Sequence, residues 1–175
     1  MLKKILIAVV VVVLALLAYA ATKPNSFRVE RSAVMKAPAA KVFAQVNDLR
    51  RWQAWSPWLK LDPAAKLSYS GLASGKGAVH SWAGNRKIGA GQMEITESVS
   101  AQKIVFKLDF SKPFKATHMA EFTFAPQGDS TQVTWVTYGP MTYFCKVMSV
   151  FASMDKMIGQ HFEDGLAKLK SITEK

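Results

Sequence analysis

The chain has 175 residues, of which 50% are hydrophobic and 11% are aromatic. This length suits one domain with a packed core, and it excludes a multidomain enzyme and an intrinsically disordered chain. Lysine and arginine total 23 against 12 aspartates and glutamates, a net charge of +11, but the basic residues are spread along the chain. Because no basic cluster is present, we expect no nucleic-acid partner.

The first predicted element is an uncharged apolar helix over residues 5–21, with two lysines before it and one shortly after it. At ~1.5 Å per residue the helix would span ~25 Å, and the flanking lysines could extend that reach to the width of a membrane. The segment Ala18-Tyr19-Ala20 also fits a signal-peptide cleavage site. A single-pass membrane anchor and a cleaved signal peptide therefore both stay open for residues 1–23. Either would place residues 24–175 on the exported side of a membrane, periplasmic or extracellular.

The remaining elements follow an order typical of an α+β domain. A strand is expected over residues 27–36, and a helix with an apolar stripe begins at Ala37-Pro38. Six further segments have strand character, at residues 66–71, 78–84, 91–98, 103–110, 116–124 and 131–138. The short turns between them predict an antiparallel meander rather than β-α-β units.

One face of this sheet is predicted to be apolar. Ile104, Phe106, Leu108 and Phe110 alternate with polar residues along their strand. A C-terminal helix supplies the cover, since its apolar residues recur at helical spacing from Met154 to Ile172. The sheet must then curve around that helix, and we expect a cavity with an apolar and aromatic lining between them.

Four segments of this sequence resemble a known superfamily. They are VERSAVMKAPAAKVFAQVNDLRRWQAWSPW (29–58), YSGLASGKGAVHSWAGN (69–85), GAGQMEI (89–95) and IGQHFEDGLAKLK (158–170). They resemble the helix-grip (SRPBCC, START-like) superfamily, which includes START lipid-transfer domains, the major birch-pollen allergen and polyketide cyclase/dehydrases. The chain is most similar to membrane-anchored bacterial members of the polyketide cyclase/dehydrase group. The resemblance implies a helix-grip domain over residues 24–175, with about seven strands around the C-terminal helix and a hydrophobic small molecule or lipid as its ligand.

Strand parity and the resemblance together predict the residues that line the cavity. Parity places Phe106 and Phe110 on the apolar face, and the resemblance brings one tryptophan of the Trp52, Trp55 and Trp58 cluster to the pocket mouth. The predicted ligand contacts are Trp55, Trp82, Met93, Phe106, Phe110, Trp135, Tyr138, Met157 and His161. Ordinary core packing is the alternative for each of them.

No catalytic motif joins the polar residues. Cys145 is the only cysteine, which excludes an internal disulfide, and the three histidines are far apart in the sequence. Glu94 and Glu97 are three residues apart on a predicted strand, so we expect them on opposite faces. We therefore predict no catalytic residue, metal or cofactor.

The sequence favours a domain that binds a hydrophobic molecule or lipid and that residues 5–21 hold at a membrane. The alternatives are a cyclase- or dehydratase-like enzyme and a protein-interaction module with a filled core.

Overall fold

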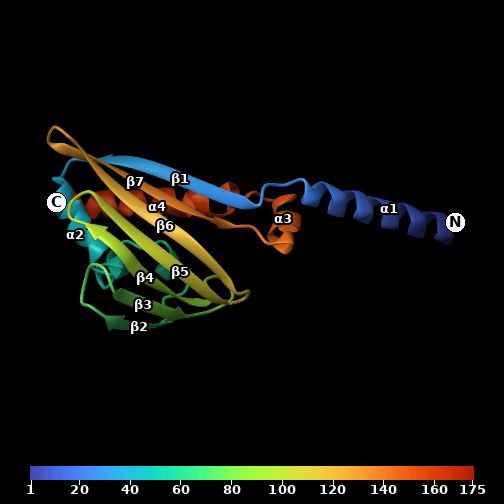
Figure 1. The fold of residues 1–175 in the computed structure, drawn as a ribbon, viewed down its shortest axis with the longest axis horizontal. Helices are drawn as coiled ribbons and strands as arrows, with labels where there is room; N and C mark the ends of the chain where they lie inside the picture. Colours follow the sequence, from blue (N-terminus) through green and yellow to red (C-terminus); the bar gives the residue numbers. More distant parts are fainter.

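A seven-stranded antiparallel sheet forms the larger layer of the protein, whose computed structural model describes residues 1–175 (Figure 1). The strands are β1 (Ser26–Met35), β2 (Lys66–Gly71), β3 (Ala78–Ala83), β4 (Ala90–Val99), β5 (Lys103–Lys112), β6 (Ala116–Gln127) and β7 (Ser130–Pro140). All seven predicted strands are present, and the α+β helix-grip fold is confirmed.

The strand order is β1-β7-β6-β5-β4-β3-β2. Strands β2 to β7 form a meander, whereas β1 crosses to the far edge and pairs antiparallel with β7 from Ser26–Pro140 to Met35–Thr131. The first and last strands in the sequence, β1 and β7, are therefore neighbours in the sheet. Its two edge strands are β1 and β2.

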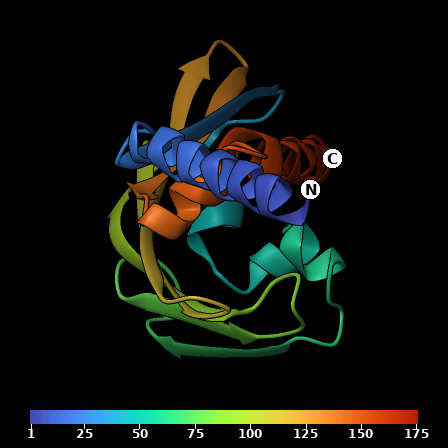
Figure 2. The same ribbon diagram turned by 90° about the vertical axis from the view of Figure 1, so that its right-hand side faces the viewer.

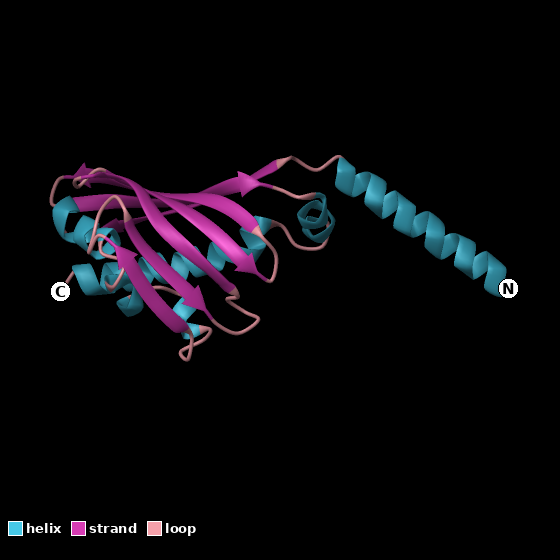
Figure 3. Ribbon diagram, turned by 60° about the horizontal axis from the view of Figure 1, so that its bottom comes forward, coloured by secondary structure: helices cyan, strands magenta, loops and turns pink.

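The helices are α1 (Leu2–Ala21), α2 (Ala39–Asn47), α3 (Tyr143–Ser149) and α4 (Met154–Thr173), with 3-10 turns at Arg51–Ala54 and Trp58–Lys60. Figure 3 shows α2 and α4 on one side of the curved sheet, while α1 projects away from both layers. Side-chain caps begin two of the helices, because Thr142 accepts from the Cys145 amide and Ser153 accepts from the Lys156 amide. The helix α3 was not predicted.

Apolar packing and ion pairs together hold α4 against the sheet. Its buried face carries Phe162, Leu166 and Leu169, as the apolar spacing predicts. At the sheet edge, Arg31 of β1 pairs with Asp155 at 2.8 Å and with Glu163 at 2.6 Å. The two acidic residues lie two turns apart on α4, so a single arginine fixes the direction of the helix relative to β1.

The concave face of the sheet is divided into a solid part and a hollow part. In the solid part, Trp52 and Trp55 from the first 3-10 turn region pack against Phe106, Phe122 and Trp135. Their ring centroids are 5.4 to 6.0 Å apart in edge-to-face arrangements. Away from this cluster the helix and the sheet enclose open space.

The N-terminal helix is longer than its uncharged run. It begins at Leu2 and covers 20 residues, or ~30 Å, which matches the hydrocarbon thickness of a bilayer. Its length and composition suffice to cross a membrane, and a signal sequence would meet the same criterion. Figure 2, viewed from the α1 side, shows α3 beside the end of α1 where the chain enters the domain.

A β-bulge corrects the expectation for Glu94 and Glu97. The register shifts between Ile95 and Glu97, so that Glu94 opposes Lys107 and Glu97 opposes Val105. Because Lys107 and Val105 are two residues apart on β5, both glutamates face the same convex side of the sheet. Strand parity counted from the sequence cannot predict the extra residue in the bulge, so it assigned the two glutamates to opposite faces.

Candidate functional site: an apolar cavity under the C-terminal helix

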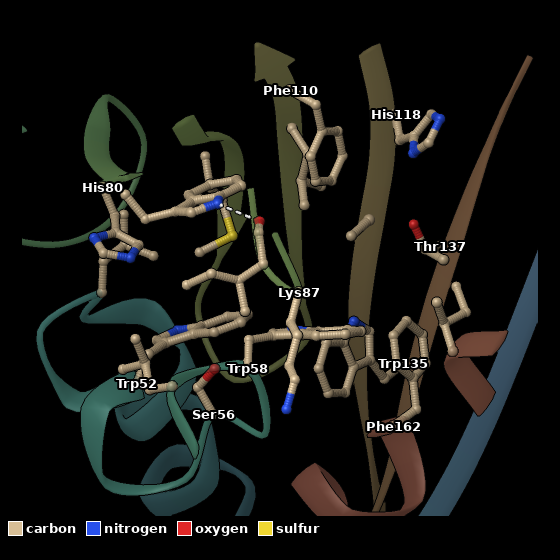
Figure 4. Close-up of a pocket in the computed structure, with 18 of the residues that line it drawn as sticks. Trp52, Ser56, Trp58, His80, Lys87, Phe110, His118, Trp135, Thr137 and Phe162 are labelled. Atoms are coloured by element: carbon tan, nitrogen blue, oxygen red, sulfur yellow. Dashed lines mark hydrogen bonds between the residues drawn. The ribbon is translucent and has the colours of Figure 1, made fainter. Parts of the chain in front are cut away.

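A cavity of about 280 Å³ lies between α4 and the concave face of the sheet (Figure 4). It is lined by 22 residues, of which 16 are hydrophobic. Its helical wall is Met154, Ile158 and Phe162, which are spaced four residues apart on α4. The volume lies just below the ~300–1,000 Å³ of small-molecule sites, so the space suits a ligand at the small end of that range.

Two exposed side chains mark the mouth of the cavity. Gln53 lies on the first 3-10 turn and Lys87 on the β3–β4 loop, and both reach solvent while lining the same space. The loop is fastened by Trp82, whose indole N–H donates to the Ile88 carbonyl at 3.1 Å. The mouth therefore has a fixed backbone with one flexible cationic side chain, Lys87, at its rim.

Several polar groups along the wall already have protein partners. The Trp52 indole donates to the Val46 carbonyl at 2.8 Å, and the Thr137 hydroxyl donates to the Met119 carbonyl at 2.9 Å. Two buried atoms are left without a partner, Nδ1 of His80 and Nε1 of Trp135. A buried polar atom without a hydrogen bond is costly, so these two atoms distinguish the cavity from ordinary core.

Two histidines line the cavity, and both are held in the neutral form. Burial lowers the pKa of His80, and a hydrogen bond with the Ser68 backbone raises it by a smaller amount. Burial also lowers the pKa of His118, whose ring packs edge-on against Phe27 at 4.9 Å. The two histidines stand on β3 and β6, three strand spacings or ~14 Å apart along the sheet, and Figure 4 shows them on opposite sides of the cavity.

The structure places four of the nine predicted ligand contacts on the cavity wall. They are Trp82, Met93, Phe110 and Trp135. Each stands on a strand and faces the concave side, as β-strand alternation requires. Their contact with a ligand stays a prediction.

Two of the nine lie in the solid core instead. Trp55 is 1% exposed and donates its indole N–H to the Gln45 carbonyl, and Phe106 is fully buried. Both face the concave side, but Trp52 and Phe122 fill the space around them. Parity alone could not separate the filled part of this face from the hollow part.

The last three of the nine do not line the cavity. Tyr138 is three residues from Trp135 on β7, and successive side chains on a strand alternate, so it faces the convex side. Met157 is half exposed to solvent, one helical step away from the lining residue Ile158. His161 lies at the edge of the helical wall and does not line the cavity, but its ring packs on the lining residue Trp58 with the centroids 4.6 Å apart.

Several lining residues were missed from the sequence. Leu108 lies between Phe106 and Phe110 on one strand face, and Tyr69 and His80 stand opposite each other on β2 and β3, so strand parity could have found all three. Gln53 and Lys87 sit on a 3-10 turn and a loop, where no periodicity indicates direction.

Fold and cavity together define a helix-grip protein with an apolar interior space. Residues 26–174 match the family described as "Polyketide cyclase / dehydrase and lipid transport". This match covers most of the chain, and the protein belongs to that family. No curated protein matches the chain significantly.

Solved structures share the fold at low sequence identity. Protein CV1439 from Chromobacterium violaceum is 15% identical with a TM-score of 0.58, covering 87% of this chain and 99% of its own. A Thermobifida fusca protein solved by NMR is 18% identical with a TM-score of 0.62, covering 83% of this chain and 92% of its own. The di-domain ARO/CYC protein BexL from the BE-7585A biosynthetic pathway is 13% identical with a TM-score of 0.60, covering 90% of this chain and 53% of BexL.

Proposed function

We propose that this protein binds one small hydrophobic molecule or a single lipid chain in the cavity under α4, while α1 holds it at a membrane. The observation that carries the proposal is the 280 Å³ space whose lining is mostly hydrophobic. Removing apolar surface from water contributes ~25 cal/mol per Å², so an apolar guest is favoured in this space. The family match to polyketide and lipid proteins agrees with this class of ligand.

The ligand should carry one or two polar atoms. The unpartnered Nε1 of Trp135 is a donor, and the unpartnered Nδ1 of His80 is an acceptor if the proton of the neutral ring is on Nε2. The Trp135 N–H could donate to a hydroxyl or carbonyl of the guest, and Nδ1 of His80 could accept from a hydroxyl. Such contacts orient a ligand that is otherwise held by burial.

Filling the cavity tests this proposal. Ala120 is 3% exposed on β6 and lines the cavity, so Ala120→Leu places three extra carbon atoms in the binding space. Ala125→Leu is the matched control, because Ala125 lies on the same strand and is exposed to solvent. Native mass spectrometry of the full chain, extracted from membranes in mild detergent, would measure the co-purifying mass.

We expect the unmodified chain to carry one small-molecule or lipid mass. The Ala120→Leu variant should lose most of that adduct, and the Ala125→Leu variant should carry it as the unmodified chain does. Equal adducts on all three proteins would show that the mass is surface-bound lipid. An unmodified chain free of any adduct across lipid mixtures would favour a protein-interaction module.

A second candidate is acid–base chemistry on the bound molecule, which the two cavity histidines favour. A neutral histidine with a free ring nitrogen can accept a proton near neutral pH. His80 provides such an atom at Nδ1 when its proton is on Nε2, and its ring is stacked on Tyr69 with the centroids 4.9 Å apart. A cyclase- or dehydratase-like activity that is lost in His80→Gln, with ligand mass retained, would establish this function instead of binding alone.

A further inference from the structure

Outside α1, exposed apolar side chains gather at one place on the surface. Phe114 on the β5–β6 turn is 61% exposed, and Phe144, Met148 and Phe151 on and just after α3 are 52%, 47% and 70% exposed. Phe144 and Met148 are four residues apart, which puts them on one side of α3. Phe151 stands in the turn after the helix, where its amide donates to the Met148 carbonyl at 3.1 Å. Phe114 packs on Phe144 with ring centroids 4.9 Å apart. We call these four residues the apolar patch.

The apolar patch is joined directly to α1. The Tyr143 hydroxyl at the start of α3 donates to the Leu17 carbonyl at 2.8 Å. Three residues further along α3, the buried Lys146 ammonium donates to the Asn25 side chain at 2.6 Å, in the linker that follows α1. These two contacts fix α3 beside the C-terminal end of α1, as both Figure 1 and Figure 2 show.

We propose that the apolar patch inserts into the surface of the same bilayer that α1 crosses, which rests on the proposed role of α1 as an anchor. Leu17 lies four residues before the end of α1 at Ala21, or ~6 Å along the helix axis. Interfacial helices bury their apolar face ~5–10 Å deep at the boundary of headgroups and acyl chains. The contact with Leu17 therefore sets α3 at the depth where an exposed apolar face is stable.

The charge around the apolar patch fits an anionic lipid surface. Lys112 and Lys115 flank Phe114 on the exposed turn. Residues 111–120 and 130–153 contain no aspartate or glutamate. Lysines beside an inserted aromatic side chain can reach lipid phosphates while their stems stay in the apolar layer.

Insertion of the apolar patch would also bring the cavity mouth to the lipid. The β5–β6 turn that carries Phe114 packs against the β3–β4 loop, where a side chain at Gly89 would collide with the Lys112 carbonyl. That loop holds Lys87 and Ile88 at the cavity mouth. A continuous series of contacts thus runs from α1 through α3 and the β5–β6 turn to the entrance, which gives a ligand a short path from the bilayer.

Depth measurements on the full chain in phospholipid nanodiscs test this inference. In a Cys145→Ser background, Phe151→Cys carries a fluorescent label in the apolar patch, and Leu72→Cys carries it on the β2–β3 connection, where Leu72 is 64% exposed. We expect lipids with a nitroxide near the headgroup to quench the label at position 151 several-fold more than the label at position 72. The difference should grow when phosphatidylglycerol is added to phosphatidylcholine.

A second variant covers the case in which labelling disturbs α3. With the label at Phe114→Cys, Phe151→Asp should reduce the quenching, because a carboxylate opposes insertion, while Leu72→Asp should leave it unchanged. Equal quenching at positions 151 and 72, with intact mass confirming that α1 is retained, would overturn this inference and leave ligand binding untouched. Energy transfer between two labelled copies in place of lipid quenching would assign the apolar patch to self-association. Loss of α1 from the intact mass would overturn the anchor and this inference together, again without touching the cavity.

Discussion

Gly165 on α4 is a position where a single methyl group should be harmful. A Cβ there would lie 2.9 Å from the Trp135 ring and 3.1 Å from the Pro57 ring. Neither can give way, since Trp135 is stacked at 4.0 Å on Phe162 and Pro57 is buried. The helix therefore approaches the sheet as closely as it does because this residue has no side chain.

We expect Gly165→Ala to lower the free energy of unfolding by about 1 kcal/mol, since overpacking costs ~1–3 kcal/mol and the gain in helix propensity returns only about 1 kcal/mol. Lys168→Ala on the same helix is the control, because Lys168 is exposed to solvent. Thermal unfolding of the two variants would measure the difference, and equal effects would show that the contact with Trp135 is not tight.

His80 should make stability sensitive to mild acid. Burial lowers its pKa in the folded state, so below the unfolded value of ~6.5 the unfolded chain binds more protons than the folded one. The free energy of unfolding should therefore fall as the pH drops from about 7 towards the folded pKa, and His80→Phe should remove part of that fall. Tyr69→Phe is the control, because it changes the ring stacked on His80 but removes no group that titrates near neutral pH. This variant should keep the full pH dependence of Tm.

Among the elements, β1 and α4 depend on one arginine for their charged contact. The guanidinium of Arg31 donates to both carboxylate oxygens of Asp155, at 2.8 and 3.1 Å, and to Glu163. The hydrogen bonds from Arg31 lower the pKa of Asp155. A carboxyl with a lowered pKa stabilises the fold above its unfolded pKa, and this contribution is lost as the pH falls through the folded value.

We expect Arg31→Met to lower Tm at neutral pH and to reduce the further loss of Tm in acid, because the Asp155 carboxyl would no longer be paired. Arg28→Met is the control, since Arg28 pairs at 2.6 Å with Glu30 on its own strand and links no two elements. If Tm falls with pH in the same way in both variants and in the unmodified chain, the ion pairs of Arg31 with α4 do not stabilise the fold.

Local patterns predicted the elements because each pattern has one physical cause. Alternation along residues 103–110 gave the face of β5, and apolar spacing gave the buried side of α4. The errors fall where a longer-range effect intervenes. The bulge after Ile95 reversed the parity of Glu97, and α3 has an exposed apolar side instead of the buried one that helix patterns assume.

At the scale of the whole molecule, the sequence could predict a concave apolar face but not how that face is filled. Trp52 and Trp55 close the part near α2. They stand in and directly after a short 3-10 segment, Arg51–Ala54, whose path no periodicity reveals. Phe106 and Phe110 share one strand face, yet one is core and the other lines the cavity. The difference depends on which distant segment packs above each ring.

The pairing of β1 with β7 also determines when the protein can finish folding during synthesis. β1 leaves the ribosome directly after α1, but its only partner strand, β7, and the helix that covers it, α4, are made after the other five strands. Contacts between distant parts of a chain form slowly, and an unpaired strand is prone to join other chains. The nascent chain thus carries an open edge until β7 has been made, and a stop codon before α4 would leave a sheet that cannot shield its interior.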